Sequence, residues 1–236
     1  MLTANVLECW RGLSVKVAVG WSGGKDSVFA LYRVLESGDF EVVKLLTTLT
    51  KDYDRVSIHG VRRILLEKQA HALGLPLDEM FISKNASNEE YEETMVAFLS
   101  RYKALGVGSV VFGDIFLREV RAYREKLLFK VGMKGVFPLW GENTAALAHQ
   151  FIAEGFKAVV TSVDSTVLSM NYVGRSFDEQ FLADLPESVD PCGENGEFHS
   201  FVYDGPLFRE KVPFQKGQVV LRENRFYYCD LLPAET

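Results

Sequence analysis

The residues best suited to chemistry lie in one short loop near the start of the chain: Ser22, Gly23, Gly24, Lys25, Asp26 and Ser27. Two adjacent glycines allow a tight turn in which backbone N–H groups approach an anion. A helix that begins directly after such a loop adds unpaired N–H donors and the positive end of its dipole. Because two hydroxyls and a Lys-Asp pair converge on the same point, the loop predicts a phosphate site and an enzyme that uses ATP.

The spacing of this loop differs from the Walker A motif, which has four residues between its first glycine and a Gly-Lys pair followed by Ser or Thr. Here Gly20 and Gly24 enclose three residues, and Asp26 follows Lys25. A carboxylate thus stands where a P-loop NTPase has a magnesium-ligating hydroxyl, which implies a different way of holding the nucleotide. We expect Lys25 and Asp26 to position phosphate and Mg²⁺. The plain alternative is an ordinary glycine-rich turn between a strand and a helix.

Two further groups of candidates follow predicted strands, where a doubly wound sheet binds its ligands. The backbone at the end of the second predicted strand, at Leu46, Thr47 and Thr48, is placed to read an adenine edge. After the fourth predicted strand, Gly113 permits close approach of a ligand, and Asp114 is placed to bind magnesium or a substrate amine. The alternative for both groups is a strand end without a ligand.

Basic residues gather at the starts of two predicted helices. Three arginines at i, i+3 and i+6 share one helical face, and their planar forks suit phosphate or carboxylate: Arg118, Arg121 and Arg124. A solvated face balanced by nearby glutamates is the alternative. His59 and Arg62 stand at the head of another helix as candidate substrate ligands. A lone histidine there is more often a cap or a surface residue.

A second concentrated segment spans residues 190–201 and contains a thiol, an imidazole and several carboxylates: Asp190, Cys192, Glu194, Glu197 and His199. Mutual repulsion makes so many acidic groups costly in a mere turn, so the segment predicts a site. Its carboxylates could orient an amine nucleophile, take its proton, or hold a metal. The alternative is a hairpin turn at Asn195-Gly196 with incidental charge.

Composition bounds these possibilities. The protein has 236 residues, 47% of them apolar, which is enough for one full core or for one core and a small second domain. A net charge of −6 argues against bulk attraction to nucleic acid or anionic membrane. Three widely separated cysteines suit a reducing, cytoplasmic compartment. No apolar run approaches the roughly 20 residues that span a bilayer, and we expect residues 1–14 to be a loose leader.

The pattern from residue 15 to residue 163 alternates short apolar runs with helical stretches, which predicts a doubly wound, mainly parallel α/β sheet. Glycines stand where four helices should end: Gly38, Gly74, Gly106 and Gly155. The expected strands cover residues 15–21, 41–49, 77–82, 109–112 and 158–161. The expected helices cover residues 27–37, 58–73, 88–105, 117–131 and 143–154.

The texture changes after residue 163, so we expect a small, loop-rich, β-containing domain over residues 164–236. It begins with a loop-rich stretch that contains one short helix, residues 178–183. Antiparallel strands follow at residues 198–203, 219–222 and 225–230. The dipeptide Glu223-Asn224 between the last two predicts a two-residue hairpin turn.

The Ser-Gly-Gly-Lys-Asp-Ser loop resembles the PP-loop of the N-type ATP pyrophosphatases, whose domain is HUP-like. The later Gly-Glu-Asn-Gly-Glu-Phe-His segment, with Asp204-Gly205-Pro206 after it, resembles the diphthine-ammonia ligase branch. Intermediate pieces agree, among them Gln69-Ala70 and Pro138-Leu139-Trp140, so the resemblance covers residues 15 to about 210. It implies cleavage of ATP to AMP and pyrophosphate, adenylation of a carboxylate, and capture by ammonia to form an amide.

The sequence also departs from the pattern of this branch. Asn195 replaces the second glycine of the late motif, and His199-Ser200 replaces Glu-Thr. Gly60 follows His59 where the family commonly has a His-Thr pair. These positions fall in the expected substrate region. The acceptor is therefore either a diphthine-like group or another carboxylate, such as the side group of a corrinoid.

Together these observations give one leading mechanism. Ser22, Gly23, Gly24 and Ser27 hold the β- and γ-phosphates, while Glu194, Glu197 and His199 bind and deprotonate ammonium. The arginines anchor the acid or offset charge on AMP, and free ammonia is the expected donor. Two rivals stay open: a tRNA-thiolating enzyme that uses Cys192, and a nucleotide sensor without turnover. Nucleic-acid binding is not expected, and an oligomer is compatible with the sequence.

Overall fold

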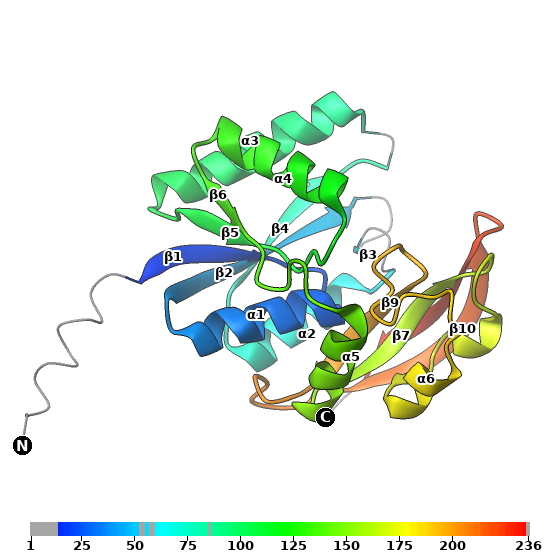
Figure 1. Ribbon diagram of the computed structural model, residues 1–236. Coiled ribbons are helices and arrows are strands. Elements are labelled where there is room, and N and C mark those ends of the chain that lie inside the picture. The colour runs from blue at the N-terminus through cyan, green and yellow to red at the C-terminus, as the bar shows by residue number, and fades with distance from the viewer. Residues whose placement is uncertain (1–13, 52–54, 57–59, 85, 235–236) are drawn as a thin grey trace, which may run out of the picture.

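The computed structural model describes residues 14–51, 55–56, 60–84 and 86–234, which form two β-sheets with helices around them (Figure 1). The predicted leader, apart from Ser14, and His59 lie outside the described residues. No helix among the residues described is long and apolar enough to cross a membrane.

The first sheet is the predicted doubly wound one. Its parallel strands follow the order β4-β2-β1-β5-β6, with the short β3 antiparallel to the end of β2. The bounds are β1 (Val15–Gly20), β2 (Phe40–Thr50), β3 (Arg55–Val56), β4 (Leu77–Ile82), β5 (Ser109–Val111) and β6 (Lys134–Val136). The predicted fold class is confirmed.

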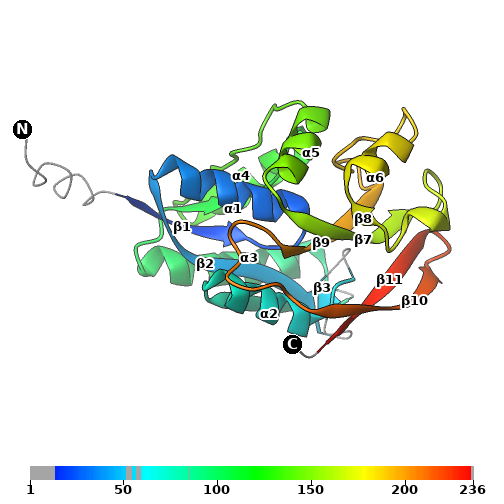
Figure 2. The same cartoon turned by 90° about the horizontal axis from the view of Figure 1, so that it is seen from below.

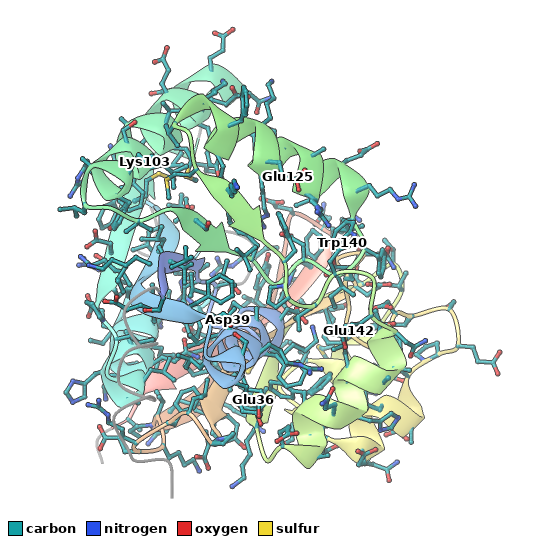
Figure 3. All side chains as sticks on the ribbon, turned by 60° about the vertical axis from the view of Figure 1, so that its left-hand side comes forward. Glu36, Asp39, Lys103, Glu125, Trp140 and Glu142 are labelled. Carbon is teal, nitrogen blue, oxygen red and sulfur yellow. The ribbon has the colours of Figure 1, made fainter. Side chains whose placement is uncertain are left out.

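Helices cover both faces of this sheet. In Figure 1, α3 (Asn88–Ala104) and α4 (Arg118–Lys130) lie above it, and α1 (Lys25–Ser37) and α2 (Arg63–Leu73) lie below it. Each face has its own apolar cluster, since the buried residues of α3 and α4 pack separately from those of α1 and α2. Charged residues such as Glu36, Lys103 and Glu125 point away from these cores (Figure 3).

The second sheet is antiparallel and has five strands, which lie to one side of the first sheet (Figures 1 and 2). The elements are α5 (Thr144–Ala153), β7 (Lys157–Asp164), a short 3-10 turn at Met170–Tyr172, β8 (Ser176–Phe177), α6 (Glu179–Asp184), β9 (Phe198–Asp204), β10 (Phe214–Arg222) and β11 (Phe226–Pro233). The central strand of this sheet is β7, which pairs with β8, β9 and β11.

One strand was assigned to the wrong sheet by its sequence. The strand predicted at residues 158–161 forms as β7, but it pairs antiparallel with β8, β9 and β11 and takes no place in the parallel sheet. The fifth parallel strand is β6, a three-residue Lys-Gly-Val segment without an apolar run. A strand that is buried on both faces has the same continuous apolar sequence in a parallel and in an antiparallel sheet. The sequence of β7 therefore matched the expected alternation of strands and helices in a parallel sheet. The division after residue 163 stays a prediction.

Local sequence signals fix the ends of the elements. All four glycines predicted at helix ends have positive φ, between 68° and 86°, as helix C-termini favour. Glu223 and Asn224 also have positive φ, 53° and 51°, which is the conformation of a type I′ hairpin turn between β10 and β11. Helix α2 begins at Arg63 and not at residue 58, because the segment before it forms β3 and a bridge between Arg55 and Arg62.

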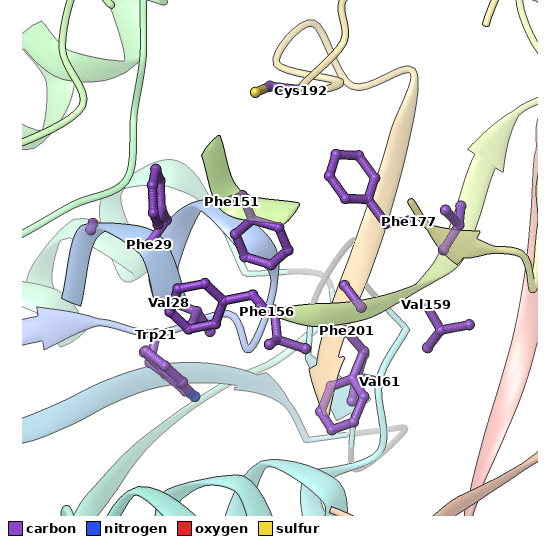
Figure 4. Packing of buried hydrophobic residues seen from close by; sticks show 14 of the residues in the cluster. Trp21, Val28, Phe29, Val61, Phe151, Phe156, Val159, Phe177, Cys192 and Phe201 are labelled. Atoms are coloured by element: carbon purple, nitrogen blue, oxygen red, sulfur yellow. The ribbon is translucent and has the colours of Figure 1, made fainter. Parts of the chain in front are cut away.

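An aromatic core joins the two sheets. Phe29 of α1 packs against Phe151 and Phe156, and Phe151 in turn contacts Phe177 of β8 (Figure 4). The cluster continues through Phe177, Phe181 and Phe198, whose ring centroids lie 5.2 to 6.0 Å apart. Because α1 carries the phosphate loop at its start, this core fixes the loop relative to the second sheet.

We expect Phe181→Ala to lower the free energy of unfolding by about 3–5 kcal/mol, because it empties a fully buried aromatic site. Urea unfolding measures the change. Phe129→Ala is the matched control: Phe129 is 81% exposed on α4, and its truncation should change stability by less than about 0.5 kcal/mol. Equal losses in the two variants would contradict the assignment of Phe181 to the core.

Candidate active site

The loop between β1 and α1 collects polar groups at the start of a helix. Ser22 Oγ accepts a hydrogen bond from Gly24 N at 3.3 Å and lies 3.2 Å from Ser27 Oγ. Ser27 Oγ in turn donates to the carbonyl of Gly24 at 3.0 Å. Gly24 is the N-cap residue and offers no capping group of its own, so the first amide groups of α1 are left for an anion or for neighbouring residues.

Strand β9 of the second sheet also contacts this loop. Ser200 Oγ of β9 accepts a hydrogen bond from the backbone N–H of Lys25 at 3.2 Å. Two residues along the same strand, Val202 N donates to the carbonyl of Gly23 at 3.0 Å. Through these two hydrogen bonds, a strand of the second sheet forms part of the wall of the loop.

A pocket of about 540 Å³ opens beside the loop, at the carboxyl ends of β1, β2 and β5. It brings together most of the residues that the sequence singled out. These lining residues are Ser22, Lys25, Asp26, Ser27, Leu46, Thr47, Thr48, Gly113, Asp114, Arg124, Glu194 and His199. Gly23 and Gly24 lie in the same loop, between lining residues.

Lys25 and Asp26 form an ion pair at the edge of this pocket, in which Lys25 is buried and the Asp26 side chain is 32% exposed. Their Nζ and Oδ2 atoms are 2.9 Å apart, and the Lys25 side chain is 5% exposed. Its ammonium lies over the ring of Phe198, 5.2 Å from the centroid. Burial opposes the charge of Lys25, but Asp26 and the other negative groups outweigh it and raise the lysine pKa. Burial also raises the pKa of Asp26, and Lys25 offsets this only in part.

Glu194 reaches the pocket from the second sheet's side. Its Oε1 accepts hydrogen bonds from two backbone N–H groups of the loop after β5, Ile115 at 2.8 Å and Phe116 at 3.3 Å. Burial raises the pKa of Glu194, and the charge of Asp26 adds to the shift, while the two N–H groups oppose it. The carboxyl is therefore held in place and also favours a proton more than an exposed glutamate does.

The loop that presents Glu194 is shaped by two other acidic residues. Asp190 Oδ1 accepts from the N–H groups of Cys192 at 2.9 Å and Glu194 at 3.2 Å. Glu197 Oε1 accepts from Asp190 N at 3.1 Å and from Asn195 Nδ2 at 2.9 Å. In the part of the protein that the structure describes, Glu197 does not line the pocket. Its contacts are those of a residue that holds the loop.

The segment after β5 packs directly on the start of α1. A Cβ atom at Gly113 would lie 2.6 Å from both the carbonyl carbon and the carbonyl oxygen of Asp26, so only glycine fits there. Asp114 forms an ion pair with Arg124, with Nε and Oδ2 2.8 Å apart. Arg124 also stacks on Phe112, 4.4 Å from the ring centroid. This packing places Asp114 and Arg124 on the pocket wall next to the phosphate loop.

Three other arginines predicted as substrate ligands do not line the pocket that the described residues form. Arg121 is stacked against Phe137 and Trp140, 4.6 Å from each ring centroid, and Arg118 is exposed. Of the three arginines on α4, only Arg124 lines the described pocket. Arg62 forms two hydrogen bonds with Asp230 of β11, at 2.6 and 3.1 Å. It ties α2 to the second sheet.

The sequence reasoning missed residues that matter to the geometry of the site. Ser200 was noted only as a departure from a motif, although it contacts Lys25. An apolar arm of the pocket was not foreseen, because its members are spread along three elements: Met80, Tyr91, Met95, Phe98, Leu99, Val120, Tyr123 and Leu127. Thr47 also lines the pocket, and its Oγ1 is buried without a hydrogen-bond partner among the described residues.

A parallel sheet of this strand order, with a Ser-Gly-Gly-Lys-Asp-Ser loop after β1, defines the PP-loop class of α/β proteins. The protein belongs to the diphthamide synthase family: residues 15–135 match its N-terminal domain and residues 143–230 match its C-terminal domain. The predicted relationship to this branch is thereby confirmed.

Named relatives agree with this assignment. The sequence is 26% identical to a diphthine–ammonia ligase of Danio rerio, over 86% of this protein and 88% of that one. It is 23% identical to a human diphthine–ammonia ligase, over 88% and 85% of the two proteins. A Schizosaccharomyces pombe diphthine–ammonia ligase is 26% identical, but the match spans 36% of its length. Among solved structures, the U34-tRNA thiolase NcsA of Methanococcus maripaludis has 12% identity and a TM-score of 0.38 over 64% of this protein and 60% of that one.

The Arg62–Asp230 contact generates a prediction on pH. Two arginines, Arg55 and Arg62, lower the pKa of Asp230 to about 2, against about 3.9 for an unpaired aspartate. A lowered pKa stabilises the folded state above pH 4, and this stability is lost as the pH falls from about 4 to about 2. Since the Asp230 side chain is 24% exposed, we expect Asp230→Asn to reduce the free energy of unfolding at pH 7 by about 1–2 kcal/mol.

Urea unfolding of the wild type and of Asp230→Asn between pH 7 and pH 2 measures this effect. The difference between them should shrink towards zero at the acidic end. The exposed Asp39, labelled in Figure 3, provides the control Asp39→Asn, which should match the wild type throughout. A difference that stays constant with pH would show that Asp230 acts by packing and not by charge.

Proposed function

We propose that the protein is an ATP-dependent ligase that adenylates a carboxylate, releases pyrophosphate and transfers ammonia to form an amide. The observation that carries the proposal is the meeting of two kinds of group in one pocket. The phosphate loop supplies anion-binding donors, and Glu194 supplies a half-buried carboxyl 2.8 Å from Ile115 N, just beyond Asp114. Membership of the diphthamide synthase family supports the same reaction class.

The nucleotide would lie along the carboxyl ends of the first sheet. Ser22, Gly23, Gly24 and Ser27 would hold the β- and γ-phosphates at the positive end of α1. The backbone at Leu46, Thr47 and Thr48, which line the pocket, would read the adenine edge. The apolar arm beside Met80 and Phe98 offers the purine a surface to pack on. Mg²⁺ brought with ATP would offset phosphate charge, and Asp26 is the residue expected to hold it.

The reaction would have two balanced steps. A carboxylate oxygen of the acceptor attacks the α-phosphorus, the bond from that phosphorus to the bridging oxygen breaks, and pyrophosphate leaves. Ammonia then attacks the acyl carbon and AMP leaves. Lys25 and Arg124 would stabilise negative charge on the phosphates and on AMP, because both cations line the same pocket.

Deprotonation of ammonium needs a base beside the adenylate. Glu194 is placed for this role, since its carboxyl faces the pocket and its raised pKa brings it closer to that of a useful general base. His199 lines the same wall and is the second candidate. Glu197 would contribute by holding the loop that carries Glu194.

The thiolation rival is disfavoured by the state of Cys192. This thiol is 3% exposed and donates to the carbonyl of Thr144 at 3.2 Å. Burial raises its pKa well above the ordinary range, so the reactive thiolate is scarce. A sulfur carrier needs the opposite environment. The acceptor stays a proposal at the level of its class, a small or protein-borne carboxylate.

A product assay tests the function. The protein is incubated with ATP, ammonium and candidate carboxylic acids, and we expect AMP and pyrophosphate in equal amounts with the amide. Release of ADP and phosphate would overturn the proposal. Binding of ATP without cleavage in the presence of any acceptor would favour the sensor.

The base assignment is tested with Glu194→Gln, which keeps an oxygen for the two N–H groups but cannot take a proton. We expect amide formation to fall by about 100-fold or more, the size of a general-base contribution. Exchange between ATP and labelled pyrophosphate, which reports adenylation alone, should stay close to that of the wild type. Glu119→Gln on the exposed face of α4 is the control and should change neither rate. Equal loss of both activities in Glu194→Gln would assign Glu194 to structure.

A further inference from the structure

A buried amide lies directly beneath the phosphate loop. Gln69 of α2 is 0% exposed. Its Oε1 accepts from the indole N–H of Trp21 at 2.8 Å, and its Nε2 donates to two carbonyls, those of Gly23 at 3.0 Å and Val202 at 2.7 Å. Both donor hydrogens and the acceptor oxygen of the amide are therefore used.

The carbonyl of Gly23 is fixed by two donors. Besides Gln69, the backbone N–H of Val202 donates to it at 3.0 Å. In a planar trans peptide, the C=O and the following N–H point in opposite directions. Holding the Gly23 carbonyl towards α2 and β9 therefore turns the Gly24 N–H away from them. It points to the side where Ser22 Oγ accepts it at 3.3 Å and where the pocket begins.

Within the loop itself, the contact that holds this peptide is the long hydrogen bond from Gly24 N to Ser22 Oγ, at 3.3 Å. Gly23 has a φ of +75°, and Gly24 has a φ of −85°. Rotation of the peptide plane by half a turn would need a positive φ at Gly24, which glycine adopts about as readily as a negative one. The rotated peptide would present a carbonyl oxygen to the phosphates in place of an N–H donor. An external lock is thus needed where two glycines adjoin.

We propose that Gln69 is a positioning residue that locks the Gly23–Gly24 peptide with its N–H facing the phosphates of ATP. This arrangement also couples the loop to the second sheet, because Gln69 and the Gly23 carbonyl both form hydrogen bonds with Val202 of β9. The packing of β9 against the loop and the ability of the loop to bind phosphate would therefore depend on the same contacts. The inference rests on the ATP site of the proposed function but not on the identity of the acceptor.

The test compares Gln69→Met with Leu65→Ala. Methionine has nearly the volume of glutamine and can donate to neither carbonyl. Leu65 is a fully buried residue of the same helix whose side group forms no hydrogen bonds, so its truncation lowers stability by packing alone. ATP affinity is measured by titration calorimetry, and the melting temperature is measured without ATP.

We expect Gln69→Met to weaken ATP binding by about tenfold or more, the effect of losing one hydrogen bond to a charged group. Leu65→Ala should lower the melting temperature at least as much and keep the wild-type affinity. Wild-type affinity in Gln69→Met, or an equal loss in Leu65→Ala, would overturn the proposal. If Gln69→Met does not fold, Gln69→Glu replaces it, since a carboxyl can donate to at most one of the two carbonyls.

A crystal structure of the Gln69 variant gives a readout that does not depend on activity. A rotated or mixed Gly23–Gly24 peptide supports the lock, and an unchanged peptide overturns it. If the wild-type protein itself binds no ATP, the proposed function fails, and the crystal structure still decides whether Gln69 orients this peptide.

Discussion

The structure depends on one contact, the seating of β9 against the phosphate loop. Val202 and Gln69 hold the carbonyl of Gly23, and Ser200 accepts from the N–H of Lys25. Two of these contacts are made by a strand of the second sheet, yet they set the conformation of a loop in the first. Because two adjacent glycines impose no conformation of their own, the anion-binding geometry comes from tertiary contacts.

The electrostatics of the pocket follow from this seating. Once β9 is in place, the preceding loop brings Asp190 and Glu194 close to the Lys25–Asp26 pair. Burial and mutual repulsion then raise the pKa values of Asp26 and Glu194, and the same negative groups keep Lys25 charged. Polyphosphate and carboxylates would repel each other here without an intervening cation. Under the proposed function, the nucleotide would bring a metal ion into this negative surrounding, and the second substrate would arrive as ammonium.

Much of this could be predicted from the sequence because it is local. Apolar periodicity located the helices, and glycines located their ends. The phosphate loop and the residues at strand ends converge because carboxyl ends of parallel strands share one edge. The predictions that failed concerned tertiary structure. A three-residue strand such as β6 has no pattern to detect, β7 could not be assigned to a sheet, and shared helical spacing could not show that Arg121 stacks on Phe137 and Trp140.

The three departures from the family motif differ in whether they affect structural contacts or the lining of the pocket. Asn195, in place of a glycine, donates to Glu197 Oε1 at 2.9 Å and so supports the loop from within. Ser200, in place of threonine, keeps the hydroxyl that accepts from Lys25 N. Asn195 thus adds a contact to the loop that presents Glu194, and Ser200 preserves a contact to the phosphate loop. His199 is different, because it lines the pocket and replaces a carboxylate with an imidazole. Of the three departures in this motif, His199 is the one that alters the chemistry offered to a substrate, and a change of acceptor would act there first.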